Sequence, residues 1–201
     1  KYADFRSTGA CATIITDYYI CAGKTPDVNT ATALLYGIKM DTLQFTRGVT
    51  DKDIEMFRYL YSRSDLEKLT RLDMELKDLK AYGAAIENIK LYDTAGFSFI
   101  PFSCPDALIG ILADFILALD EVEIAVVSSE REDGIKISVR SEISQIKADI
   151  LIRAALDGFG NAGGHSTMAA GLIPKEKVPL LGNYPKEKID SLFLEALTSM
   201  N

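Results

Sequence analysis

The second half of the chain is organised around residues 134–165, which read GIKISVRSEISQIKADILIRAALDGFGNAGGH. After the first glycine, apolar and polar side chains alternate, which predicts a half-buried strand whose isoleucines and valine face inward. Residues 144–157 then place their apolar side chains at helical spacing. The glycine-rich residues 158–165 end that helix in a loop. This order of strand, helix and glycine-rich loop predicts an α/β domain.

The residues before this segment carry further strand signals. The Asp-Gly pair at 133–134 is typical of a hairpin turn, and residues 122–128 before it predict a buried strand. Residues 96–102, rich in phenylalanine and isoleucine, predict another strand. The most apolar stretch, residues 107–119, is too short to span a bilayer and carries Asp114 in its middle, so it predicts a buried helix.

The front third of the chain predicts helices and no strand. Ser7 or Thr8 can cap a first helix, and apolar side chains at helical spacing predict a second helix that ends just before Asp41. Thr50 followed by Asp53 resembles a capping box and predicts a third helix. We therefore expect a helical region before the α/β domain.

A charged helix is expected between these two regions. It carries one narrow stripe of leucines, which is typical of a helix that is solvated on most sides. We interpret residues 65–84 as a connector helix between residues 1–64 and a second domain at residues 85–201. The leucines of the stripe are Leu69, Leu72, Leu76 and Leu79.

Charge and cysteine content limit the functional classes. A net charge of −7 argues against a surface for long duplex nucleic acid, because such surfaces need clustered lysines and arginines. A small anionic ligand in a locally basic pocket is compatible with this charge. Cys11, Cys21 and Cys104 are odd in number and widely spaced, which is typical of core thiols in a reducing compartment. We expect a cytoplasmic protein with no membrane partner.

The segment 158–171 could bind an anion. It holds five glycines and the single histidine of the chain. Backbone N–H groups of glycines can converge on an anionic oxygen, and His165 adds a donor of adjustable charge. The alternative is a glycine-rich helix end followed by a core histidine, and composition alone favours it. Arg140 is likewise either a surface arginine or a bidentate phosphate ligand, with Lys136 and Ser138 on its face of the strand.

These motifs together resemble a known family. Gly-Gly-His at 163–165, followed by Ala-Ala-Gly at 169–171, resembles the signature of the DHH-associated C-terminal domain of RecJ-type exonucleases, nanoRNases and cyclic-dinucleotide phosphodiesterases. The strand around Arg140 is similar to the substrate-clamping strand of that family, and Ser-Thr at 7–8 resembles its Ser-Thr segment. The substrate-binding residues that the resemblance implies are Ser7, Thr8, Ser138, Arg140, Gly163, Gly164 and His165.

The front of the chain resembles the catalytic domain of the same family. Gly-Ile-Lys-Met-Asp-Thr at 37–42 is similar to its Gly-Ile-x-x-Asp-Thr motif, and the resemblance implies that Asp41 is a catalytic residue that ligates metal. Without the family, turn statistics favour the interpretation of Asp41 as a turn former. The Asp-His-His triplet of the family is absent, so we expect the other ligands of two Mn²⁺ ions, or Mg²⁺ ions, upstream of Lys1.

The resemblance implies an α/β fold: the C-terminal part of a DHH domain, a connector helix and a mixed-sheet substrate-binding domain across a cleft. It implies a manganese-dependent phosphoesterase that hydrolyses short oligonucleotides, nucleotide phosphates or cyclic or linear dinucleotides, and it allows a homodimer. Without most metal ligands, this chain alone is expected to be inactive. Two alternatives stay open: a hydrolase of pyrophosphate or polyphosphate, and a non-catalytic nucleotide-binding module.

Overall fold

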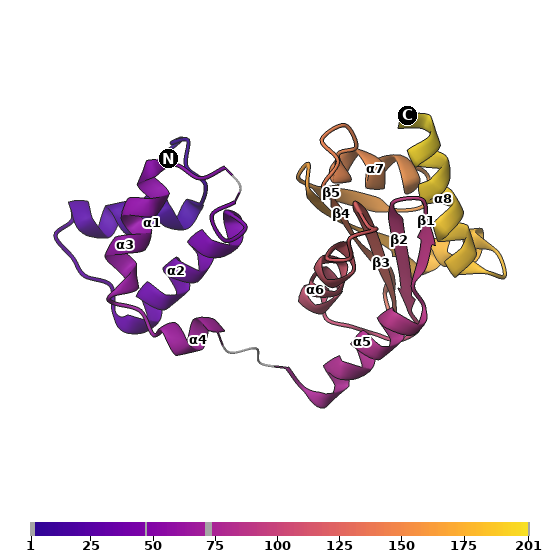
Figure 1. Ribbon diagram of the computed structural model, residues 1–201, viewed down its shortest axis with the longest axis horizontal. Helices are drawn as coiled ribbons and strands as arrows, with labels where there is room; N and C mark the ends of the chain where they lie inside the picture. Colours follow the sequence, from indigo (N-terminus) through magenta and orange to yellow (C-terminus); the bar gives the residue numbers. More distant parts are fainter. Residues whose placement is uncertain (1–2, 47, 71–73, 201) are drawn as a thin grey trace. The chain divides into compact units, whose positions relative to one another are not determined.

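The computed structural model describes residues 3–46, 48–70 and 74–200 (Figure 1). The chain divides into two compact units, Lys1–Asp73 and Met74–Asn201. The first unit is helical in its described residues, and the second is built on a six-stranded sheet. Each unit has its own hydrophobic core.

The N-terminal unit packs two helices against each other through fully buried side chains. Leu35 and Ile38 from one helix and Met56 and Leu60 from another have no exposed surface. None of the described residues of this unit lies in a strand, in agreement with the sequence. Its helices are α1 (Cys11–Cys21), α2 (Val28–Asp41), α3 (Asp51–Tyr61) and α4 (Leu66–Thr70).

Helix caps in this unit match the sequence in one case and differ in another. The capping box of α3 is formed by Thr50 and Asp53 as predicted. The predicted cap of α1 by Ser7 or Thr8 is wrong, because the helix begins at Cys11 and its N-cap is Ala10. The backbone before α1 is held outside the helix by other partners, among them the buried carboxylate of Asp53, which accepts a hydrogen bond from Gly9 N.

The cysteines of α1 contradict the expectation of core thiols. Cys11 and Cys21 are exposed, whereas Cys104 in the second unit is buried. The reason is the orientation of α1, which turns Thr13 and Thr16 toward the interior. Burial raises the pKa of the Cys104 thiol, as expected for a thiol removed from water.

The predicted single connector helix is replaced by two helices. α4 ends at Thr70, and α5 (Leu76–Glu87) begins six residues later in the numbering. Leu72 of the predicted stripe lies outside the described residues. α5 packs against strand β2 (Ala95–Ile100) of the second unit, so it covers part of the sheet of that unit. Its leucines Leu76 and Leu79 are 77% and 55% exposed, which agrees with the predicted solvated face.

The second unit contains the predicted mixed α/β sheet. Its strand order is β1-β2-β3-β4-β6-β5, and β2 and β3 are parallel while every other neighbouring pair is antiparallel. The predicted hairpin joins β3 and β4, with Arg131 paired to Gly134. The strands are β1 (Lys90–Tyr92), β2 (Ala95–Ile100), β3 (Ile124–Arg131), β4 (Gly134–Ser141), β5 (Asn161–Gly164) and β6 (Met168–Pro174).

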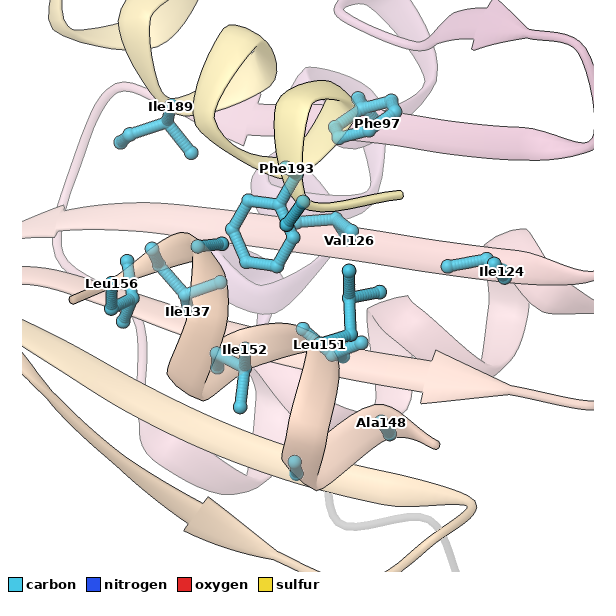
Figure 2. Packing of buried hydrophobic residues seen from close by; sticks show 14 of the residues in the cluster. Phe97, Ile124, Val126, Ile137, Ala148, Leu151, Ile152, Leu156, Ile189 and Phe193 are labelled. Carbon is cyan, nitrogen blue, oxygen red and sulfur yellow. The ribbon is translucent and has the colours of Figure 1, made fainter. Parts of the chain in front are cut away.

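Helices cover the two faces of this sheet unequally (Figure 1). One face packs against α7 and α8, and Figure 2 shows Phe193 of α8 directed toward the strands beside Leu151 and Ile152 of α7. On the other face, α6 covers β3 and β4. The covering elements are α6 (Asp106–Leu117), α7 (Ala148–Ala155), the 3-10 helix η1 (Lys175–Leu181) and α8 (Pro185–Met200).

Helix α6 corresponds to the most apolar stretch of the sequence, but only one of its faces is buried. Leu112 and Ala113 are fully buried, whereas Ile111 and Phe115 are 46% and 45% exposed. Among the described residues, no helix combines the length and the apolar character needed to cross a membrane.

The glycine-rich segment forms a strand, which corrects the prediction of a loop. β5 pairs with β6 along its whole length, from Asn161 opposite Leu172 to Gly164 opposite Ala169. The glycines allow this close approach: a Cβ on Gly164, whose φ is +156°, would lie 2.4 Å from the Cα of Ala169. The preceding helix is also shorter than predicted, since α7 covers Ala148–Ala155.

Candidate functional site

A partly open surface lies on the α6 face of the sheet, where β4, β6 and β5 lie side by side. Ser138 of β4 pairs with Ala170 of β6, which pairs with Gly163 of β5. Paired residues of antiparallel strands point to the same face, so these three small residues form one row across the sheet. Ala170 is exposed although it lies on a strand with neighbours on both sides. The row is therefore open to solvent at Ala170, whereas Gly163 is half-buried and Ser138 is buried.

Gly163 differs from its neighbouring glycines because packing does not require it. A Cβ added to Gly163 would meet no heavy atom within 4 Å. A Cβ on Gly171 would lie 2.6 Å from Leu156 Cδ1, and Gly164 is more crowded still. The missing side chain at Gly163 leaves its backbone accessible, a common use of glycine where a ligand approaches closely.

His165 lies in the tight turn between β5 and β6. Its backbone N–H donates to Met168 O at 2.7 Å, and its side chain is exposed. The alternative of a buried core histidine is therefore excluded. Met168 is also the strand partner of Arg140, so the turn lies at the end of the sheet that carries this arginine.

The guanidinium of Arg140 has a partner for each of its N–H groups, and its side chain is only 13% exposed. Nε donates to Asp114 Oδ1 at 2.5 Å, and Nη2 donates to Asp114 Oδ2 at 3.4 Å and to Gly110 O at 3.2 Å. Nη1 donates to Ser138 Oγ at 2.9 Å and to Val139 O at 3.2 Å. In this structure Asp114 holds the bidentate edge, and the role of Arg140 in binding substrate stays a prediction.

Lys136, the other cation of this face, is also paired with a carboxylate of α6. Its Nζ lies 3.1 Å from Asp106 Oδ2, and Asp106 also contacts Arg131. The hydrogen bond from Lys136, with added attraction from both cations, outweighs burial and lowers the pKa of the Asp106 carboxyl. Helix α6 thus supplies one carboxylate to each cation of the open face.

A cavity of about 660 Å³ opens elsewhere in this unit, near the β3–β4 hairpin and the start of α8. Phe99, Ile135 and Tyr184 are among its lining residues. None of the predicted site residues lines it. On the face beside α6, Ser138 and Arg140 share β4 and Gly163 lies in the row of Ser138, whereas Gly164 pairs with Ala169 and shares the opposite face.

In the N-terminal unit, one buried carboxylate ties three segments together. Asp53 has no exposed surface and accepts hydrogen bonds from Gly9 N at 2.8 Å and from Thr13 Oγ1 at 2.5 Å. Thr50 donates from both its N–H, at 2.8 Å, and its hydroxyl, at 2.6 Å. Burial raises the pKa of this carboxyl, but these hydrogen bonds outweigh burial and hold the pKa below its usual value.

This network places the Ser7–Thr8 segment against the end of α2 that carries Asp41. A Cβ on Gly9 would lie 2.7 Å from Thr42 Cγ2, so the backbone at Gly9 lies close against the Thr42 side chain. Thr42 is buried and donates its hydroxyl to Ile38 O at 2.6 Å. Asp41 is the last residue of α2 and is exposed. The two motifs of the front region are therefore neighbours in space.

The described residues do not by themselves form a metal centre. They contain no group of three or more histidine, cysteine, aspartate or glutamate side chains arranged to hold an ion. A pair of bridged manganese ions needs several such ligands, so the residues present do not fit that group without further ones. The role of Asp41 as a metal ligand stays a prediction.

Sequence reasoning missed Asp114 and the full role of Asp53. Asp114 was noted only as a charge within an apolar stretch, yet an acidic residue in such a helix is itself a signal of a specific partner. Asp53 was interpreted as part of a capping box, and its bonds to Gly9 and Thr13 cross 44 and 40 residues of sequence. Neither pairing has a local pattern that could reveal it.

Residues 94–191 match the family described as the DHHA1 domain. The chain is 31% identical over 180 residues to uncharacterized protein MJ1633 of Methanocaldococcus jannaschii, covering 87% of this chain and 37% of that protein. A crystal structure of an exopolyphosphatase-related protein from Bacteroides fragilis has a similar fold, with a TM-score of 0.72 and 20% identity. That match covers 94% of this chain and 56% of that structure. The chain thus spans less than two thirds of either protein.

Proposed function

We propose that the chain is part of a DHH-superfamily phosphoesterase that acts on small nucleotides, because its residues 94–191 match the DHHA1 domain. The substrates we propose are short oligonucleotides, nucleotide phosphates, and cyclic or linear dinucleotides. The single observation that supports this choice is the row of small residues Ser138, Ala170 and Gly163, which is exposed at Ala170 and has Lys136 and Arg140 on either side of Ser138.

The dimensions of this row suit one nucleotide. Three neighbouring strands span about 10 Å, the scale of a base with its sugar. Lys136 and Arg140 are separated by four residues along β4, which corresponds to roughly 13 Å between their backbones. Small side chains let a flat group lie close to the strands, and the exposed His165 offers a donor to a negatively charged one; Lys136 and Arg140 would bind it by exchanging their carboxylate partners.

The chemistry proposed for the intact site is hydrolysis of a phosphoester bond. Two divalent ions would supply the nucleophile and neutralise phosphoryl charge. We propose Asp41 as one ligand, with manganese as the metal and magnesium as the alternative. Ser7 and Thr8 are proposed to bind substrate near Asp41, since Gly9 holds their segment against Thr42. A small substrate fits the net charge of −7 better than a long duplex.

The experiment that tests this proposal is an assay of the full-length protein in manganese. Release of mononucleotides from a linear dinucleotide is expected, and Asp41→Ala is expected to abolish it. Asp51→Ala serves as the control, because it removes an exposed carboxylate in the same unit. Absence of turnover by folded, metal-loaded protein would refute the phosphodiesterase proposal.

The same assay separates the two alternatives. Release of phosphate from pyrophosphate without cleavage of the dinucleotide would indicate a phosphoanhydride hydrolase. Nucleotide binding that is indifferent to manganese and to Asp41→Ala, without turnover of either compound, would indicate a non-catalytic binding module.

A further inference from the structure

The bidentate edge of Arg140 is occupied by a carboxylate of the same unit. Nε and Nη2 form the edge with which an arginine binds two oxygens of a phosphate, and both donate to the two oxygens of Asp114. We infer that Asp114 occupies the place of the terminal phosphate of the ligand and that a ligand binds by displacing it. This inference rests on the proposed nucleotide-binding function.

The contacts around Arg140 allow such an exchange. The Asp114 side chain is 57% exposed, so it can turn into water, whereas Arg140 is 13% exposed. When Asp114 leaves, Gly110 O, Ser138 Oγ and Val139 O still hold Nη1 and Nη2 in place. The freed edge therefore keeps its orientation for an incoming phosphate.

Gly110 allows the Arg140 guanidinium to lie against the backbone of α6. A Cβ at this position would lie 3.1 Å from Arg140 Nη2, so a larger residue would push the guanidinium away from the carbonyl that it bonds. Gly110 and Asp114 are one helical turn apart on α6. The helix thus offers a fixed acceptor and a displaceable acceptor to the same guanidinium.

Displacing Asp114 from Arg140 should cost the ligand little of its binding free energy. Exposed ion pairs shift an equilibrium by only about fivefold or less, so Asp114 lowers ligand affinity without preventing binding. A phosphomonoester carries up to two negative charges against one for Asp114, which favours the ligand. We therefore expect Asp114 to select for ligands with a terminal phosphate.

The test measures binding of adenosine 5′-monophosphate to the chain by calorimetry at low ionic strength. Asp114→Asn is expected to tighten binding by about threefold to tenfold, because it removes both the competitor and a nearby negative charge. Asp120→Asn makes the same change in net charge at an exposed position outside α6 and is expected to leave the affinity within about twofold of wild type. Arg140→Gln is expected to weaken binding strongly.

A spectroscopic measurement reports on the exchange directly. In the wild type, the Arg140 Nε–Hε resonance should move on addition of adenosine 5′-monophosphate, and in Asp114→Asn it should start from a different position. A resonance that does not move while the nucleotide binds would overturn the inference, even if Asp114→Asn proved unstable.

The outcomes distinguish this inference from the proposed function. If Arg140→Gln loses binding while Asp114→Asn binds no better than wild type, Asp114 is not a competitor and the nucleotide site still stands. If Arg140→Gln binds as well as wild type, or if wild type does not bind, the proposed site and the inference both fail.

Discussion

At the scale of single residues, the two glycines of β5 have different roles. Gly164 is needed for folding because β6 lies against it, whereas Gly163 has open space beside it and is proposed to serve binding. Gly163→Ala introduces a methyl group into open space, so the free energy of unfolding should change by no more than about 0.5 kcal/mol. The same methyl group covers the row shared with Ala170 and Ser138 and should raise the KM for a dinucleotide. Thermal denaturation and steady-state kinetics check the two parts, and an unchanged KM would remove Gly163 from the site.

Asp53 provides a second prediction at this scale. Asp53→Ala leaves the Gly9 N–H and the Thr13 hydroxyl without their acceptor and should cost about 3 kcal/mol of stability at pH 7. The folded-state pKa lies below the unfolded one, so the contribution is complete above about pH 4. It is lost as the pH falls through the lower, folded-state pKa. Urea denaturation at several pH values should therefore show a weaker acid dependence in the variant; identical profiles would contradict this.

At the scale of elements, β5 depends on how closely its glycines approach β6. Gly164→Ala would force the new Cβ against the backbone of Met168 and Ala169 and combine overpacking with positive-φ strain. We expect a loss of about 2 kcal/mol or more. Amide exchange should accelerate in β5 and β6 while the α6 core stays protected. If amide exchange accelerated equally throughout the unit, β5 would not unfold independently of the rest of the sheet.

The elements that the sequence predicts well are those with a local repeat. The alternation in β4, the Asp-Gly hairpin and the capping box of α3 all depend on residues within a few positions of one another. β5 was missed because glycines have no strand preference, and its pairing with β6 supplies the structure. The occupancy of Arg140 was missed for a related reason, since its partner Asp114 lies 26 residues away on another element.

At the scale of the whole molecule, the site residues fall into two groups, one in each unit. Asp41 lies with Ser7 and Thr8 in the helical unit, whereas Arg140, the glycines and His165 lie in the DHHA1 domain. Tertiary contacts determine the arrangement within each group; in the helical unit, one such contact is that of Gly9 with Thr42. This separation predicts a division of labour between metal binding and substrate binding.

That division predicts different effects of two substitutions in the full-length protein. His165→Ala removes an exposed imidazole from the β5–β6 turn, so the KM for a dinucleotide should rise while the affinity for manganese stays within about twofold of wild type. Asp41→Ala should instead weaken manganese binding and abolish turnover. Calorimetric titration with manganese and steady-state kinetics on both variants check the pattern. If His165→Ala lost metal and substrate affinity equally, the imidazole would belong to the metal site, and substrate binding could not be assigned to the DHHA1 domain alone.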